Sequence, residues 1–286
     1  MGRLFGTDGV RGKVNTVLTG SLAYKLGLAL GKILKEKNIS GEVLIGRDTR
    51  ISGAMLENAL AAGLMAQGIS VVSLGIIPTA GVAWLVKQRH AAAGAVISAS
   101  HNPAYDNGIK FFSSAGYKIP DEMELEIEAA ILDRDDLEQT VVDGTAVGKI
   151  IWDTAGISAY QAYLASIFSD DFSRLSCVID CANGAASAIA PGLFQSLSLP
   201  AKFIATTPDG LNINNGCGST HLESLQKTVL AEQYAQFGLA FDGDADRLLA
   251  VDDCGEVVDG DEIIAICSKY LWENQQLTGN KLVVTM

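Results

Sequence analysis

Short apolar runs alternate along this chain with longer segments in which apolar residues recur every three or four positions. Apolar runs of about four to eight residues are typical of buried strands, and the longer periodic segments are typical of amphipathic helices. The pattern predicts strands at residues 42–45, 69–74 and 91–98, with helices at residues 52–67 and 79–89 between them. Strands that alternate with helices indicate repeated βαβ units, so we expect an α/β fold with mixed, mainly parallel sheets.

The segment after these units closes a first domain. A hairpin is expected about residues 114–116, followed by an acidic helix that starts at Pro120 and ends near Asp133. The polar, turn-rich residues 133–148 are typical of a linker. The first domain is therefore predicted to span residues 1–150.

The same alternation restarts in a second domain, predicted at residues 151–252. Its expected helices lie at residues 154–168 and 222–234, with another that ends at Leu197, and its strands lie at residues 177–180, 201–205 and 237–241. Residues 253–286 are interpreted as the start of a third domain. The last six residues, 281–286, read as an apolar strand that nothing in the chain covers, so we expect a truncated protein.

Length and composition limit the class of protein. A length of 286 residues suits about two domains, and an apolar fraction of 48% excludes a disordered chain. No apolar run approaches the roughly 18 residues of a membrane span, and the N-terminus lacks the apolar core of a signal peptide, which predicts a cytoplasmic protein. The net charge of −12 disfavours nucleic acid and anionic membranes as partners. An anionic small substrate would have to be bound by local cations.

The cysteines do not form a recognisable framework. Their number is odd, and no pair has C-x-x-C spacing, so reduced thiols in the core are expected rather than disulfides or a zinc site. The five are Cys177, Cys181, Cys217, Cys254 and Cys267.

A serine in a polar loop directly after a buried strand is the first candidate for chemistry. Ser100 follows the apolar run 91–98, and ligands of open α/β sheets bind at the carboxyl ends of strands. His101 adds a titratable ring, and a turn at residues 106–108 is expected to bring Lys110 back to the same place. We therefore expect Ser100 to carry a phosphoryl group beside Lys110. An ordinary S-H-N-P turn is the alternative.

Three carboxylates follow another predicted strand. Asp242, Asp244 and Asp246 alternate along the chain, which would place them on one side, with Arg247 next to them. Carboxylates held so close repel one another unless a hard cation is present, and oxygen ligands suit Mg²⁺. An EF-hand is excluded, because its sixth and twelfth positions would hold Arg247 and Asp253 in place of glycine and glutamate. A solvated acidic turn is the alternative.

Three arginines in the first domain are further candidates. Arg11 lies among glycines in F-G-T-D-G-V-R-G, where the backbone could approach a phosphate and the guanidinium could bind it. Ordinary turns use glycine too, so both interpretations stay open. Arg47 and Arg50 flank Asp48 after a strand, and for them we favour a structural ion pair over ligand binding.

Four motifs in this order resemble those of the α-D-phosphohexomutase superfamily, and the similarity covers essentially the whole chain. The residues of these motifs resemble the glucosamine branch more than the phosphomannomutase branch. The motifs are F-G-T-D-G-V-R-G, G-R-D-T-R-I-S-G, S-A-S-H-N-P-A-Y-D-N-G-I-K-F-F and D-G-D-A-D-R.

The resemblance implies roles for individual residues. It implies that Ser100 is the phosphoserine, and that Mg²⁺ is bound by a phosphoserine oxygen and the three carboxylates. It further implies that four side chains surround the transferred group, with Lys110 as the favoured acid and base. The carboxylates are Asp242, Asp244 and Asp246, and the surrounding side chains are Arg11, His101, Lys110 and Arg247.

The resemblance also implies an isomerase of hexosamine phosphates. It would interconvert glucosamine 6-phosphate and glucosamine 1-phosphate through a bisphosphate intermediate and feed the synthesis of UDP-N-acetylglucosamine and cell wall. The alternatives are a phosphomannomutase or phosphoglucomutase, and a non-catalytic sugar-phosphate-binding fragment. The superfamily has four domains, and the loops of the third and fourth are absent here, so we expect this chain alone to be inactive. The state of assembly stays open, a homo-oligomer included.

Overall fold

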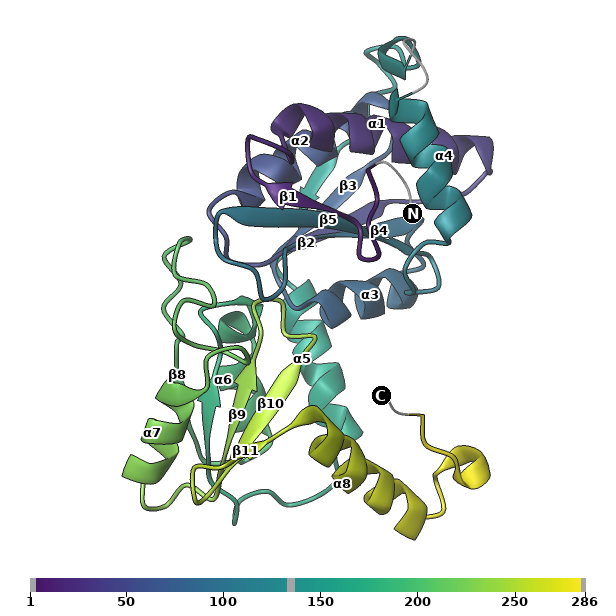
Figure 1. Ribbon diagram of the computed structural model, residues 1–286. Helices are drawn as coiled ribbons and strands as arrows, with labels where there is room; N and C mark the ends of the chain where they lie inside the picture. Colours follow the sequence, from purple (N-terminus) through teal and green to yellow (C-terminus); the bar gives the residue numbers. More distant parts are fainter. Residues whose placement is uncertain (1–3, 133–136, 284–286) are drawn as a thin grey trace.

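The computed structural model describes residues 4–132 and 137–283, which form two sheets with helices around them (Figure 1). In the described part of the chain the first sheet has six strands and the second has five. We call them, with the helices that cover them, the first and the second unit. Helix α8 projects from the second unit, with the C-terminal residues beyond it (Figure 1).

The first sheet is mixed. Its three pairings among β2, β3, β4 and β6 are parallel, whereas β5 runs antiparallel to both β4 and β1. In the order in which they pair, the strands are β1 (Val10–Lys13), β5 (Asp106–Ser113), β4 (Ala93–Ile97), β2 (Val43–Arg47), β3 (Val71–Ile76) and β6 (Ile150–Trp152).

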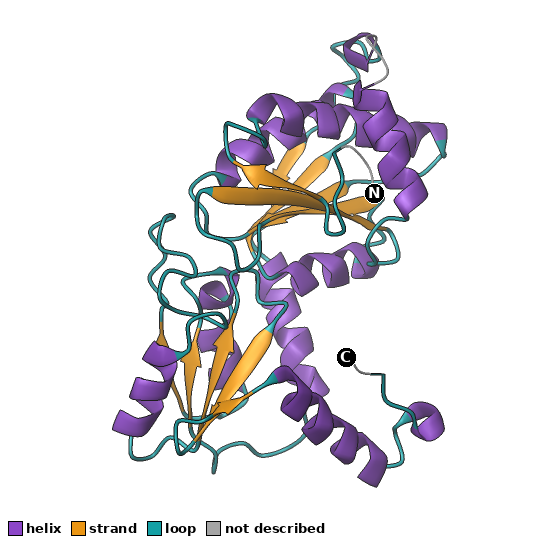
Figure 2. Ribbon diagram, viewed as in Figure 1, coloured by secondary structure: helices purple, strands orange, loops and turns teal. Residues whose placement is uncertain are grey.

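Helices cover both faces of this sheet (Figure 2). Helices α1, α2 and α4 lie on one face and α3 lies on the other (Figure 1). Their bounds are α1 (Gly20–Glu36), α2 (Gly53–Ala66), α3 (Thr79–Gln88) and α4 (Asp121–Leu132), and a short 3₁₀ helix, η1, spans Leu137–Gln139. Alternate strand residues divide between the two faces. In β2, for example, Ile45 packs in the core under α1 and α2, and Leu44 packs in the core under α3.

Two glycines allow α1 and α2 to approach closely. A Cβ atom on Gly27 would lie 2.2 Å from the carbonyl oxygen of Leu60, and one on Gly63 would lie 2.1 Å from that of Tyr24. Any larger residue at either position would push the helices apart. This contact anchors α2, which begins directly after the G-R-D-T-R loop.

The second sheet is also mixed. Strand β7 is parallel to β8 and β9, and β10 is antiparallel to β9 and β11. In pairing order the strands are β11 (Val257–Val258), β10 (Leu248–Asp252), β9 (Phe237–Phe241), β7 (Cys177–Asp180) and β8 (Ala201–Ile204). The remaining helices are α5 (Gly156–Ile167), η2 (Ala185–Ala188), α6 (Ala190–Ser196), α7 (Glu223–Ala231), α8 (Gly260–Glu273) and η3 (Thr278–Asn280). The predicted α/β class with mixed, mainly parallel sheets is confirmed.

The chain reverses earlier than predicted around Ser100. The expected turn at residues 106–108 is wrong, because β5 already begins at Asp106 and the reversal lies upstream of it. The reason is an edge strand that the sequence did not reveal. Strand β1 lies within and just after the glycine-rich opening and pairs with the start of β5, so that Gly12 faces Asn107. Pairing with β1 holds the polar residues 106–108 in an extended conformation, although their sequence favours a turn.

Two further expectations concern the ends of the units. Strand β6 pairs with β3, so the predicted boundary near residue 150 falls inside a strand of the first sheet. Residues 281–283 are not a strand, which contradicts the predicted strand for that part. The end of α4 near Asp133 and the rest of the expected final strand, residues 284–286, lie outside the described residues.

Among the described helices, none combines the length and the apolar character that a membrane span needs.

Three of the cysteines are buried and two are exposed, and none forms a disulfide. Burial raises the pKa of Cys177, Cys181 and Cys217 to about 12. Cys254 and Cys267 are the exposed pair.

A thiol reagent should therefore modify only two cysteines of the native protein. We expect Cys267 to react faster than Cys254, because Asp253 and Asp252 raise the pKa of Cys254 and so reduce its thiolate fraction. All five should react after denaturation. The measurement is a colorimetric thiol titration, with a variant carrying both Cys254→Ser and Cys267→Ser as the control. Rapid reaction of a third thiol in the native protein would contradict the packing described here.

Candidate functional site

Ser100 lies in the loop after β4 with a backbone φ of +52°, which is uncommon for a residue other than glycine. Three hydrogen bonds hold this conformation. The Ser100 N–H donates to Ser98 Oγ over 2.9 Å. The Ser100 carbonyl oxygen accepts from Arg50 Nη2 over 3.2 Å and from Asn214 Nδ2 over 2.9 Å. The loop also requires a glycine opposite it, because a Cβ on Gly243 would lie 2.6 Å from that carbonyl oxygen.

A buried ion pair lies behind this loop. Asp48 and Arg50 are 0% and 1% exposed, and a guanidinium nitrogen of Arg50 donates to Asp48 Oδ2. Asp48 Oδ2 also accepts from Ser98 Oγ over 2.6 Å. The other terminal nitrogen of Arg50 donates to the carbonyl oxygen of Asn102 over 2.5 Å. The predicted structural pairing of Arg50 with Asp48 is confirmed, and this pair supports the backbone on both sides of Ser100.

Three carboxylates gather in the loop between β9 and β10. The ligand oxygens of Asp242, Asp244 and Asp246 lie within 4.8 Å of one another. They do so because the loop turns, with Ala245 at a φ of +58°, and not because the residues alternate along a strand as predicted. Asp242 and Asp244 are buried. Asp244 Oδ1 is buried and has no hydrogen-bond partner among the described residues.

Ser100 meets this cluster directly. Its Oγ donates to Asp242 Oδ2 over 2.5 Å. Arg247 Nη2 donates to Ser100 Oγ and to His101 Nδ1. The hydroxyl of the first unit therefore lies between a carboxylate and a guanidinium of the second unit.

Lys110 lies on β5, where its ammonium group faces three carboxylates. Lys110 Nζ is 3.1 Å from Asp8 Oδ2, 3.5 Å from Asp244 Oδ2 and 3.6 Å from Asp246 Oδ2. Burial lowers the pKa of Lys110, but these carboxylates outweigh burial and the pKa lies above its usual value. Arg11 also forms an ion pair with Asp8. The Nε atom of Arg11 is buried and has no hydrogen-bond partner in the described part of the chain.

Burial and neighbouring charges shift the pKa values of the titratable groups in this site in different directions. Burial raises the pKa of Asp246, and the charges of Asp244 and Asp242 raise it further. For Asp244, burial raises the pKa as well, but the charge of Lys110 and other contacts outweigh it and the pKa is lowered. Burial and the neighbouring guanidinium of Arg247 lower the pKa of His101, which favours a neutral ring. Arg247 donates to Nδ1 of that ring, so its proton belongs on Nε2.

The structure brings all eight predicted site residues into one connected cluster. One part of the cluster consists of Ser100, His101, Asp242 and Arg247. The other part consists of Lys110, Asp244, Asp246 and Arg11, which reaches Lys110 through Asp8. The backbone N–H of Asp246 donates to Asp242 Oδ1 over 3.2 Å and links the two parts.

Four neighbours of the cluster were not predicted as site residues. Asp8 lies inside the glycine-rich motif, and no local signal in the sequence marks the other three, which are Asp48 as a support of Ser100, Thr79 and Asn214. The predicted pairing of Arg47 with Asp48 is wrong, because Arg47 pairs with Glu57.

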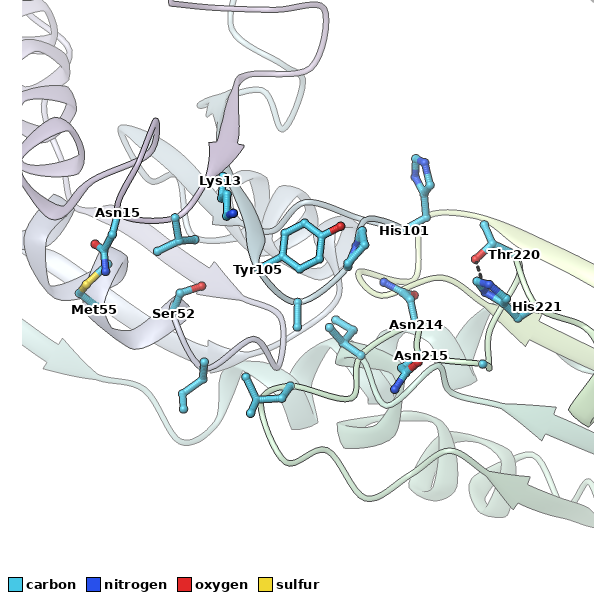
Figure 3. A pocket seen from close by; sticks show the side chains of 17 residues that line it. Lys13, Asn15, Ser52, Met55, His101, Tyr105, Asn214, Asn215, Thr220 and His221 are labelled. Atoms are coloured by element: carbon cyan, nitrogen blue, oxygen red, sulfur yellow. Dashed lines mark hydrogen bonds between the residues drawn. The ribbon is translucent and has the colours of Figure 1, made fainter.

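A cavity of about 960 Å³ opens beside the Ser100 loop, between the two units. Figure 3 shows its wall, with Lys13 and Tyr105 from the first unit and Asn214 and His221 from the second. Of the eight predicted site residues only His101 lines it, so the clustered carboxylates and cations lie outside this cavity. We therefore place the candidate chemistry at the cluster itself.

Comparison with known proteins identifies the family. The model of the phosphoglucomutase/phosphomannomutase alpha/beta/alpha domain I matches residues 2–138, and that of domain II matches residues 158–255. A phosphoglucosamine mutase from Carboxydothermus hydrogenoformans is 49% identical over 286 residues. This alignment covers 100% of the chain and 64% of the relative, so the chain spans less than two thirds of the relative's length.

Solved structures share the fold. A putative phosphomannomutase from Thermus thermophilus superposes with a TM-score of 0.81 at 27% identity, covering 94% of this chain and 61% of that one. An N-acetylphosphoglucosamine mutase from Aspergillus fumigatus, in complex with GlcNAc-6P and magnesium, superposes with a TM-score of 0.52 at 18% identity, covering 94% and 55%. The two matching domain models, which together cover most of the chain, establish that it belongs to the phosphoglucomutase/phosphomannomutase family.

Proposed function

We propose that this chain belongs to an enzyme that interconverts glucosamine 6-phosphate and glucosamine 1-phosphate, with Ser100 as the phosphoryl carrier. The observation that carries the proposal is the position of Ser100 Oγ, in contact with both Asp242 and Arg247. The name of the relative that is 49% identical over the whole chain supports the choice of sugar. Because the chain spans 64% of that relative, the isomerisation is proposed for the whole protein.

The proposed reaction is two phosphoryl transfers. In the first, the bond between phosphorus and Ser100 Oγ breaks, a bond forms between phosphorus and a hydroxyl oxygen of the sugar phosphate, and the proton of that hydroxyl passes to Ser100 Oγ. The bisphosphate then turns over. Ser100 Oγ attacks the other phosphoryl group, returns its proton to the sugar oxygen that leaves, and becomes phosphoserine again. Such transfers depend on positioning and charge rather than on unusual nucleophiles.

The carboxylate cluster fits a magnesium ion. All its donors are oxygens, which Mg²⁺ prefers, and Asp244 Oδ1 is a buried acceptor without a partner in the described residues. We infer that Asp242, Asp244 and Asp246 hold the ion, with an oxygen of phosphorylated Ser100 as a further ligand. Bound Mg²⁺ would neutralise the negative charge that develops during transfer.

The surrounding cations have separable roles in this proposal. The raised pKa of Lys110 favours an ammonium ion before the reaction. Lys110 can therefore give a proton to the departing oxygen and then recover one from the attacking hydroxyl. Arg11, with its unpartnered Nε, can bind a phosphate oxygen beside the glycine-rich loop. Arg247 contacts Ser100 Oγ, and His101 presents Nε2–H as a hydrogen-bond donor.

Glucosamine is the sugar in this proposal. The product would supply the synthesis of UDP-N-acetylglucosamine and of cell-wall precursors. A phosphomannomutase or phosphoglucomutase would use the same phosphoserine chemistry. Turnover of the 6-phosphates of glucosamine, glucose and mannose by the whole protein separates these functions, and a clear preference for either of the last two would replace the proposed substrate.

Ser100 should be the one phosphorylated residue. Incubation with a hexose 1,6-bisphosphate should add one phosphoryl group to the protein, and phosphopeptide mapping should place it on Ser100. We expect no phosphorylation of the Ser100→Ala variant, whereas Ser113→Ala, at the far end of β5, should behave as the wild type. A phosphate found on Ser98 or Ser113 would refute the assignment.

Magnesium should bind at the carboxylate cluster and stabilise the fold. At a free concentration about 100 times the Kd, it should add about 2.7 kcal/mol to the free energy of unfolding. Asp246→Asn, the variant at the least buried of the three acids, should weaken binding at least about tenfold by removing ligand charge. Without Mg²⁺ this variant should be no less stable than the wild type, because it also removes repulsion between carboxylates.

The control is a second acidic group elsewhere on the surface. Asp252, Asp253 and Cys254 also lie close together, so Asp253→Asn removes the same charge at a site with no proposed ion. Calorimetric titration of both variants with Mg²⁺ makes the comparison. Equal affinities in the wild type, Asp246→Asn and Asp253→Asn would show that the cluster is an acidic turn.

A further inference from the structure

One residue of the first unit holds Asp244 in two ways. Thr79 is the first residue of α3, and it is 8% exposed. Its Oγ1 donates to Asp244 Oδ2 over 2.6 Å, and its backbone N–H donates to the Asp244 carbonyl oxygen over 3.1 Å. The main chain and the carboxylate of Asp244 are therefore both fixed from across the interface between the units.

These bonds decide which oxygen of Asp244 is left for a ligand. Lys110 Nζ also approaches Oδ2, but over 3.5 Å, so the Thr79 hydroxyl makes the shorter contact. Oδ1 is buried and unpartnered among the described residues. With Oδ2 held by the hydroxyl, rotation of the carboxylate is restricted and Oδ1 is the oxygen that remains for a cation.

The hydroxyl of Thr79 has no other structural task in the helix. The N-cap of α3 is Pro78, which makes no side-chain capping bond, so the Thr79 hydroxyl does not cap α3. Its bond to Asp244 runs instead between residues 165 positions apart in the chain. The hydroxyl of Thr79 therefore orients Asp244 and does not cap the helix, which is the usual role of a threonine at a helix N-terminus.

We propose that Thr79 is a positioning residue for the metal site: its hydroxyl, which comes from the first unit, orients Asp244 of the second unit, so magnesium affinity depends on this hydrogen bond. This inference rests on the proposed function, because it takes Asp244 as a magnesium ligand. Groups that hydrogen-bond a ligating side chain commonly change metal affinity by about 10–100-fold when they are removed. The expected effect of Thr79 lies in that range.

Thr49 provides a matched comparison at the same interface. Its Oγ1 also donates across the interface, to the backbone carbonyl oxygen of Asn183 over 2.5 Å. At 6% exposed it is as buried as Thr79, but its partner is not a carboxylate. Loss of the Thr49 hydroxyl should therefore disturb the contact between the units without changing the orientation of Asp244.

The experiment is a calorimetric titration of Mg²⁺ into the wild type, Thr79→Val, Thr79→Ser and Thr49→Val, with unfolding of each followed in a chelator. We expect Thr79→Val to weaken Mg²⁺ binding about 10–100-fold. Thr79→Ser should restore most of the affinity, because it keeps the hydroxyl, and Thr49→Val should bind as the wild type does. Similar melting temperatures of Thr79→Val and Thr49→Val in the chelator would show that the loss is local.

The outcomes distinguish this inference from the proposed function. If the wild type binds Mg²⁺ and Thr79→Val binds it equally well, or Thr49→Val loses as much, the role of Thr79 is refuted while the metal site stands. If the wild type binds no Mg²⁺, the proposed metal site itself fails, and this inference with it. Should Thr79→Val not fold, the affinity of Thr79→Ser against that of Thr79→Ala decides, and equal affinities refute the role.

Discussion

The buried ion pair between Asp48 and Arg50 is the interaction on which the site depends. Arg50 donates to the carbonyl oxygens of Ser100 and Asn102, and Asp48 accepts from Ser98, whose hydroxyl in turn accepts from the Ser100 N–H. Ser100 can hold its left-handed conformation because both of its peptide groups are bound in this way. Loss of either charge would leave the other buried and unpaired, which typically costs about 3–5 kcal/mol. The pair therefore fixes the direction in which the Ser100 hydroxyl points.

Charge balance is the second constraint. Four carboxylates meet three cations in the cluster, where Asp8, Asp242, Asp244 and Asp246 face Arg11, Lys110 and Arg247. A phosphoryl group on Ser100 would add about −1.5 to −2 charges. The protein as a whole carries −12 and offers no general attraction for an anion. A divalent cation at the carboxylates and the local arginines and lysine are thus complementary requirements of the same site.

Much of this could be predicted from the sequence, because the chemistry follows strand ends that hydrophobic patterning reveals. Ser100 lies three residues after the end of the buried strand β4, and Asp242 directly follows β9. The alternation of strands and helices predicts the fold class. Local patterns failed where distant segments decide the outcome. Strand β1 was not predicted, since the glycines in and before it indicate a loop, and only its pairing with β5 makes it a strand. The carboxylates converge through a turn at Ala245, and Thr79 acquires its partner only when the two units meet.

The site exists only because the two units contact each other, and this explains why its supports are spread so widely along the chain. Ser100, Lys110 and Thr79 come from the first unit, whereas the carboxylates they touch come from the second. Asn214 returns from the second unit to hold the Ser100 carbonyl. Each unit thus completes the hydrogen bonding of the other's functional loop. A change that separated the units would leave Ser100 without its carboxylate neighbour and Asp244 without the hydroxyl that orients it, even if both sheets stayed folded.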